Sequence, residues 1–247
     1  MINKSNLAIK EDIENGDAIA SNIGKIINID KAVTKENNKR NVIYRFIKRT
    51  IDIIGALFGI ILLIPTTIML YIVRKILKED DGPLFYEHLR YGKNGKMFRI
   101  YKYRSMCMDA DAKLKEYLEQ NEEARKEFEE YQKLSNDPRI TKLGNFLRRT
   151  SLDELPQMLN ILRGDLSFVG PRPVVKNELE RYGKNKDTFL SVKPGLTGYW
   201  QVNGRSNTTY DERMEMELYY ARNCSLWLDA KIFIKTFVTV LKREGAM

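Results

Sequence analysis

The chain has 247 residues, with 42 Lys and Arg against 33 Asp and Glu, a formal net charge of +9 at pH 7. This length is enough to bury a core without disulfide or metal staples, and two distant cysteines with one histidine exclude the usual Cys/His zinc sites. The positive charge favours an anionic partner, which leaves nucleic acids, phosphorylated substrates and acidic membrane surfaces open.

Residues 1–42 are polar and rich in Asn, Lys and Ile, which predicts a weakly structured tail with a short amphipathic piece around Ile19 to Ile29. The run from Ile53 to Val73 then has 21 residues without a charge. As a straight helix it would measure roughly 32 Å at about 1.5 Å per residue, close to the hydrocarbon thickness of a bilayer. We expect it in or on a membrane. The alternative is a buried core helix of a soluble protein.

Pro65 lies in the middle of this run, where it removes one backbone hydrogen bond and clashes with the carbonyl of Ile61, so we expect a break there. Cations flank both ends, and the positive-inside rule therefore selects no orientation. They are Arg45, Lys48, Arg49, Arg74, Lys75 and Lys78. We favour a re-entrant helix with both ends on the cytoplasmic face over a tilted span. This divides the chain into a tail (1–42), a membrane-inserted helix (43–79) and a cytoplasmic domain (80–247).

The segment from Leu84 to Met106 has two β-rich runs around Lys93-Asn94-Gly95, which predicts a hairpin. Lys102 and Arg104 are two residues apart in the second run, so they are expected on one face.

Two later segments are predicted to be helical. Asp109 to Asn136 is Glu-rich, with Glu122 and Lys126 at helical spacing, and is expected to be a solvated helix. Ser225 to Arg243 combines a broad apolar face with Trp227 near one end. Such a helix suits a membrane interface or the protein's own core, and both readings stay open.

The densest cluster of candidate chemistry runs from Leu147 to Pro173. A capping box at Ser151 would place Pro156 inside the helix, so we expect the helix to begin at Asp153 with the proline in its first turn. Asp153 and Glu154 would then sit at a helix N-terminus, where free amide donors suit phosphate and keep Asp153 ionised.

Cations surround this acidic pair in the sequence. Arg148 and Arg149 directly precede it, and a guanidinium matches phosphate geometry. Prolines restrict the backbone on both sides of Arg172, which presents that side chain at low entropic cost; a rigid turn without function is the alternative. The run from Lys193 to Arg205 predicts a turn and a short strand that end in another cation.

Three strings occur in order behind the hydrophobic segment: YKYRSM, SLDELPQMLNILRGDLSFVGPRP and KPGLTGYWQVNGR. From Tyr44 to Met247 the chain thereby resembles the bacterial sugar transferase family, the small monotopic phosphoglycosyl transferases. We therefore expect an α+β fold: a mostly helical cytoplasmic catalytic domain with a small β-hairpin region. A re-entrant N-terminal helix and interfacial amphipathic helices would attach it to the membrane.

The resemblance implies an activity. Family members move a hexose-1-phosphate from a nucleotide sugar, usually a UDP-sugar, to undecaprenyl phosphate and release UMP. This is the initiating membrane step of surface polysaccharide or glycoconjugate synthesis, and it needs Mg²⁺. The expected partners are a UDP-sugar, undecaprenyl phosphate and membrane lipid, with no nucleic acid; the sugar, the pathway and a homodimer are left open.

The resemblance also implies residue roles. Asp153 is the expected nucleophile on the β-phosphate, and Glu154 assists it as metal ligand or general base, with both carboxylates near the metal. Arg148 matches a lipid-phosphate contact, and Pro65 matches the break in the membrane helix. We assign the nucleotide sugar to Arg172, Lys102, Arg104 and Arg205.

The sequence departs from the family at two points. Ile64 stands where members often have Ser, and the tail is too short for the multi-span region of larger members, so we expect a catalytic unit with a short extension. Two other classes of protein compete with this reading. A nucleic-acid binder would not need the 21-residue apolar run. A membrane-anchored scaffold could keep the fold, but the intact acidic pair and arginines argue against it.

Overall fold

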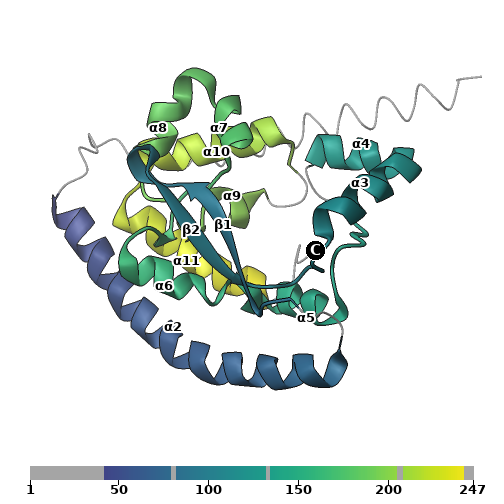
Figure 1. The fold of residues 1–247 in the computed structure, drawn as a ribbon. Helices are drawn as coiled ribbons and strands as arrows, with labels where there is room; N and C mark the ends of the chain where they lie inside the picture. Colours follow the sequence, from purple (N-terminus) through teal and green to yellow (C-terminus); the bar gives the residue numbers. More distant parts are fainter. Residues whose placement is uncertain (1–41, 79–81, 132–133, 205–207, 242–247) are drawn as a thin grey trace, which may run out of the picture. The chain divides into compact units, whose positions relative to one another are not determined.

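The computed structural model describes residues 42–78, 82–131, 134–204 and 208–241. These residues belong to one compact unit, Arg40–Met247. In the described part of the chain most residues are helical, and four short strands form an antiparallel pair, β1–β2, and a parallel pair, β3–β4 (Figure 1). The predicted α+β class, mostly helical with a small hairpin, is confirmed.

Helix α2 (Val42–Leu77) contains the apolar run. One stripe of it packs on the domain through Ala56, Leu63 and Leu70, which are buried. Other apolar side chains face outward, and Phe58 is 70% exposed. Among the described helices, α2 is long and apolar enough to cross a membrane, and little of it is covered by protein. The core-helix alternative is therefore wrong, since a core helix would be enclosed.

The helix does not break at Pro65. Its helical backbone continues through the proline, and α2 changes direction along its length instead (Figure 1). Two hydroxyls directly after the proline bond back to the preceding turn: Thr66 Oγ1 donates to the Leu62 carbonyl and Thr67 Oγ1 to the Leu63 carbonyl, each at 2.7 Å. Such bonds favour a bend without interrupting the helix. How α2 meets a membrane stays a prediction, as do the proposed domain limits.

The hairpin is confirmed. Strand β1 (Phe85–Tyr91) pairs antiparallel with β2 (Met97–Tyr103), with the short turn η1 (Lys93–Gly95) between them. Asn94 and Gly95 have φ of 58° and 75°, a left-handed backbone that these two residue types adopt most readily. The turn could therefore be predicted from these two residue types.

The Glu-rich segment forms two helices rather than one, α3 (Ala110–Gln120) and α4 (Glu122–Tyr131). Asn121 between them is extended, and its side-chain oxygen accepts a hydrogen bond from the Ala124 N–H at 3.0 Å, so it caps the second helix. The expected pair is present, with Lys126 Nζ 3.0 Å from Glu122 Oε1.

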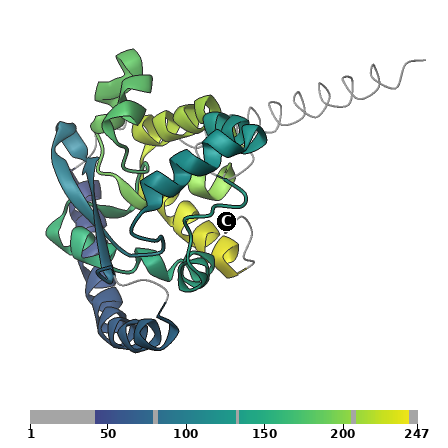
Figure 2. The ribbon, with the colours of Figure 1, turned by 45° about the vertical axis from the view of Figure 1, so that its right-hand side comes forward.

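Shorter elements build the rest of the domain. They are α5 (Lys142–Thr150), η2 (Leu152–Glu154), α6 (Gln157–Arg163), β3 (Ser167–Val169), α7 (Lys176–Arg181), η3 (Gly183–Asn185), α8 (Lys186–Leu190), β4 (Gly195–Thr197), α9 (Tyr199–Asn203), α10 (Tyr210–Asn223) and α11 (Leu226–Leu241). Helix α6 packs against both α2 and β2, as the two views show (Figure 1, Figure 2). Buried Met158 and Ile161 of α6 join Ala56, Phe98 and Ile100 in one core cluster.

The structure tests one of the two alternatives for helix α11, packing on the protein's own core. Leu228 and Ile232 are buried, so one face packs on the domain core. Trp227, Ile234 and Phe237 stay exposed on the other side. Packing is confirmed for the first face, and contact of the second with a membrane interface stays a prediction.

Candidate active site

Asp153 and Glu154 lie in η2, the single turn between α5 and α6. The predicted helix start at Asp153 is wrong, because α6 begins at Gln157. Ser151 has a left-handed backbone, with φ of 56°, and ends α5 instead of capping the next helix. Pro156 then directly precedes α6, where a backbone N–H would have no intrahelical acceptor, so the proline costs no hydrogen bond. The acidic pair therefore sits in a separate turn and gains no helix N-terminus.

Lys102 of β2 reaches this acidic pair. Its Nζ lies 2.6 Å from Glu154 Oε1 and 4.0 Å from Asp153 Oδ2. The structure thus brings a cation of the hairpin to two adjacent carboxylates 51 and 52 positions further along the chain. One positive charge between two negative charges is a strong local influence on both.

The two carboxylates titrate differently. Burial raises the pKa of Asp153 to about 6; Lys102 opposes this shift and Glu154 adds to it. Burial would also raise the pKa of Glu154, but the charge and hydrogen bond of Lys102, followed by the charge of Arg172, bring it below its usual value. Glu154 is thus the partner that is ionised at neutral pH, while Asp153 becomes mostly ionised only above about pH 6.

Arg148, in the last turn of α5, faces the site. Its Nε donates to Ser105 Oγ at 2.9 Å, and its charge acts on Asp153. Arg149, the next residue, is exposed. Helix α5 packs closely against the backbone of Ser105, because a Cβ on Gly144 of α5 would lie 1.9 Å from the Ser105 carbonyl oxygen. Ser105 belongs to the YKYRSM string, but its role in holding Arg148 was not predicted.

Arg172 lies in the loop after β3 and is held by α10. Its backbone N–H donates to both carboxylate oxygens of Glu217, at 3.1 and 3.0 Å. Among the described residues its side-chain Nε is buried without a hydrogen-bond partner. The guanidinium charge acts on Glu154, so Arg172 lies near the acids, and its assignment to the nucleotide sugar stays a prediction.

Glu217 was missed by the sequence reasoning. It is fully buried in α10, and burial raises its pKa to about 7, against the opposing charge of Arg213. The available signal was a charged residue inside an otherwise apolar stretch, Met216 to Ala221. A carboxylate in such a place needs partners, which here include a backbone N–H in the Gly-Pro-Arg-Pro loop.

Arg104, another predicted cation, is not brought to the acids. Arg104 follows the last residue of β2, Tyr103, and its Nε donates to the Pro83 carbonyl at 2.9 Å. Its guanidinium also lies over the Tyr86 ring. Its assignment to the nucleotide sugar together with Lys102 therefore has no support in the geometry. Arg205 lies outside the described residues, and its assignment stays a prediction.

The donor chemistry of this turn can be compared with what Mg²⁺ requires. Among the residues that the structure describes, no group of three or more His, Cys, Asp or Glu side chains comes together. The adjacent carboxylates of Asp153 and Glu154 nevertheless fit an ion that is usually held by one or two carboxylates, water and substrate phosphates. These two residues would hold the ion when a phosphorylated substrate is present.

Comparison with known proteins agrees with this geometry. Residues 43–243 match the family model described as "Bacterial sugar transferase". The chain belongs to the bacterial sugar transferase family. The match covers α2, the hairpin, the acidic turn and α10, and so contains every described residue of the candidate site.

Named relatives extend the comparison. The chain is 48% identical over 211 residues to an "Undecaprenyl-phosphate galactose phosphotransferase" of Salmonella typhimurium, covering 85% of this chain and 44% of that protein. It is 46% identical over 210 residues to a "UDP-galactose-lipid carrier transferase" of Erwinia amylovora, covering 85% and 43%. It is 42% identical over 199 residues to the "Exopolysaccharide production protein ExoY" of Rhizobium meliloti, covering 81% and 87%. The chain thus spans less than half the length of the first two and most of the third.

Proposed function

We propose that the chain transfers a hexose-1-phosphate from a UDP-sugar to undecaprenyl phosphate and releases UMP. One observation carries the proposal: a buried carboxylate, Asp153, lies beside an ionised Glu154 that Lys102 holds at 2.6 Å. This arrangement provides a nucleophile that is ionised at neutral pH, with cations ready to offset phosphate charge. The names of the Salmonella and Erwinia relatives support the choice of donor and acceptor.

The reaction divides into two displacements at one phosphorus. In the first, a carboxylate oxygen of Asp153 bonds to the phosphorus that carries the sugar, and the bond from that phosphorus to the bridging oxygen breaks, so UMP leaves. In the second, an oxygen of undecaprenyl phosphate attacks the same phosphorus and the bond to Asp153 breaks. The product is a lipid diphosphate sugar, and the carboxylate is regenerated.

Different residues around the acids would bind the two substrates. Arg148, beside the acids, would hold the lipid phosphate, and Arg172 and Lys102 would hold the diphosphate of the donor. When bound to Asp153 and Glu154, Mg²⁺ would offset the charge that develops on the phosphoryl oxygens. Ser105 and Glu217 touch the arginines and not the reacting atoms, so we regard them as positioning residues.

The same proposal places the enzyme on the cytoplasmic face of the bacterial cell membrane, at the start of exopolysaccharide synthesis. The exposed apolar surface of α2 and the relatives support membrane association. Single cysteines at Lys75 and in the tail test whether both ends of α2 are cytoplasmic. Both should resist an impermeant thiol reagent outside intact cells. Labelling of the tail alone would establish a span.

Activity is tested by UMP release. The chain in detergent, with Mg²⁺ and undecaprenyl phosphate, should release UMP from UDP-galactose or from its epimer UDP-glucose. Asp153→Asn should abolish release, whereas Asp111→Asn on exposed α3 should not change it. Absence of release with both sugars and with a wider panel of UDP-sugars would favour the scaffold class.

A further inference from the structure

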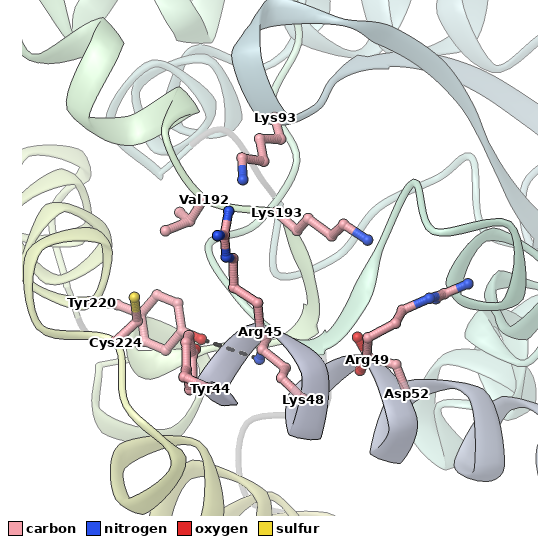
Figure 3. A pocket seen from close by; sticks show the side chains of 10 residues that line it. All are labelled: Tyr44, Arg45, Lys48, Arg49, Asp52, Lys93, Val192, Lys193, Tyr220 and Cys224. Carbon is pink, nitrogen blue, oxygen red and sulfur yellow. Dashed lines mark hydrogen bonds between the residues drawn. The ribbon is translucent and has the colours of Figure 1, made fainter. Parts of the chain in front are cut away.

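A second feature is a cavity of about 260 Å³ at the N-terminal end of α2 (Figure 3). Ten residues line it; five are basic and one is acidic. The charged ones are Arg45, Lys48, Arg49, Asp52, Lys93 and Lys193. They come from α2, from the hairpin turn η1 and from the loop before β4, so the fold gathers cations from three separate parts of the chain.

This cavity is distinct from the active site. Arg49 donates from its two terminal nitrogens to the carbonyls of Ile161 and Leu162, at 2.6 Å each, in the last turn of α6. Asp153 and Glu154 precede the first turn of the same helix. A seven-residue helix is about 10 Å long, and none of the proposed catalytic or substrate-binding residues lines the cavity.

Besides Arg49, two more of the charged lining residues contact β3 or α11. Lys48 Nζ lies 2.7 Å from Asp229 Oδ2 and donates to the Val169 carbonyl at 2.8 Å. The acidic residue, Asp52, accepts hydrogen bonds from the Ser167 hydroxyl and the Phe168 N–H, both at 2.9 Å. The single carboxylate of the cavity is therefore engaged with β3 and is outnumbered by the five cations of the lining.

The lining of the cavity thus carries an excess of positive charge, five cations against one carboxylate. The Arg45 side chain extends from α2 toward Val192 and Lys93, and Lys193 extends from the neighbouring loop (Figure 3). Lys193 is half-buried, and this burial lowers its pKa, as does the nearby charge of Arg49, while the charges of Asp52 and Asp165 only partly oppose the shift. Like charges held together raise the free energy of the folded state unless an anion joins them.

The position of the α2 cations in the sequence indicates which kind of anion the cavity binds. Arg45, Lys48 and Arg49 lie within about two helical turns of Ile53, where the charge-free run of α2 begins. If that run enters the bilayer, as the proposed function requires, the cavity lies at the level of the lipid headgroups. The location thus favours a lipid as the source of the anion.

We propose that this cavity binds the phosphate group of an anionic phospholipid, at a site separate from the active site. Arg45 and Lys193 would contact the phosphate, with Arg49 and Lys93 contributing charge. The membrane location rests on the proposed function, but the anion chemistry does not. A zwitterionic headgroup suits the site poorly, because its ammonium would enter a cavity that is already positive.

The test compares ligands on the full chain in detergent. We would follow thermal unfolding while adding short-chain phosphatidylglycerol, short-chain phosphatidylcholine or inorganic phosphate. Phosphatidylglycerol should stabilise the protein in a saturable manner, phosphatidylcholine should not, and phosphate should compete. The variant Arg45→Gln/Lys193→Gln should bind phosphatidylglycerol at least about tenfold more weakly, the effect of losing charge-assisted hydrogen bonds.

A matched control removes the same residue types elsewhere: Lys113→Gln/Arg125→Gln on exposed parts of α3 and α4 should bind like the unmodified chain. Without ligand the double variant should be at least as stable as the unmodified chain, because it lacks the repulsion around Lys193. Arg45→Gln alone, at an exposed position, serves as a second probe if the double variant does not fold.

Each outcome decides the proposal. An equal response of the double variant and the unmodified chain to phosphatidylglycerol, or no response of either, would overturn it. Stabilisation by inorganic phosphate alone would overturn the lipid as the source. UMP release measured on the same samples separates the two proposals. If the unmodified chain releases UMP normally but does not bind phosphatidylglycerol, only the lipid-site proposal is contradicted. If it binds phosphatidylglycerol but releases no UMP, only the proposed activity is contradicted.

Discussion

The backbone N–H of Arg172 donates to both carboxylate oxygens of Glu217, 45 positions further along the chain, at 3.1 and 3.0 Å. This contact anchors the Gly-Pro-Arg-Pro loop on α10, whereas the prolines restrict the backbone only locally. The conformation that presents the Arg172 guanidinium thus depends on a buried carboxylate far away in the sequence.

Glu217→Gln should loosen this loop. Burial raises the pKa of Glu217 to about 7, so the comparison is made at about pH 8, where the carboxylate is mostly ionised. A charge-assisted hydrogen bond contributes about 1.5–3 kcal/mol, so we expect the KM for the UDP-sugar to rise by roughly 10-fold or more, with little change in the KM for undecaprenyl phosphate. Glu215→Gln, an exposed neighbour in α10, should leave both KM values unchanged. Equal changes in both KM values, or a normal enzyme, would remove the positioning role of Glu217.

Lys102 should set the pH dependence of the first displacement. Asp153 must be ionised to attack, and burial raises its pKa to about 6, so the rate of UMP release should rise with pH through about 6. Lys102 favours the ionised form, so Lys102→Gln should move this rise to higher pH. Lys96→Gln, exposed near the hairpin turn, is the control. An unshifted profile in Lys102→Gln would mean that another group titrates.

Gly144 should be intolerant of a side chain. A Cβ there would lie 1.9 Å from the Ser105 carbonyl oxygen, so Gly144→Ala must push α5 away from the segment that holds Arg148. Overpacking of this kind costs roughly 1–3 kcal/mol, which lowers the Tm by a few degrees for a chain of this size. Asn145→Ala, exposed on the same helix, should change the Tm little. Thermal unfolding measures both, and equal Tm values for the two variants would contradict the close contact.

Local chemistry predicted part of this fold. Asn94-Gly95 specified the hairpin turn, and the charge-free run specified α2. The backbone around the acids was less predictable, because the left-handed Ser151 terminates one helix where its sequence resembles the cap of another. A proline in a long helix likewise indicates a distortion, but the surrounding packing and hydroxyls decide between a bend and a break.

The long-range contacts of the site were beyond pattern reasoning. Lys102 and Arg104 share a spacing that suits one face, yet β2 ends between them at Tyr103, and only Lys102 reaches the acids. Ser105 and Glu217 act through partners 43 and 45 positions away. Their roles depend on how α5 and α10 pack, which no local spacing records.

The central claim, a covalent step at Asp153, is tested most directly without the lipid acceptor. The chain with Mg²⁺ and the correct UDP-sugar, but without undecaprenyl phosphate, should exchange labelled UMP into the UDP-sugar and leave one sugar-phosphate on the protein. Asp153→Asn should abolish this exchange together with turnover, whereas Glu154→Gln retains some of each. Exchange that requires undecaprenyl phosphate, or turnover by Asp153→Asn, would contradict the covalent step and favour direct attack by the lipid phosphate.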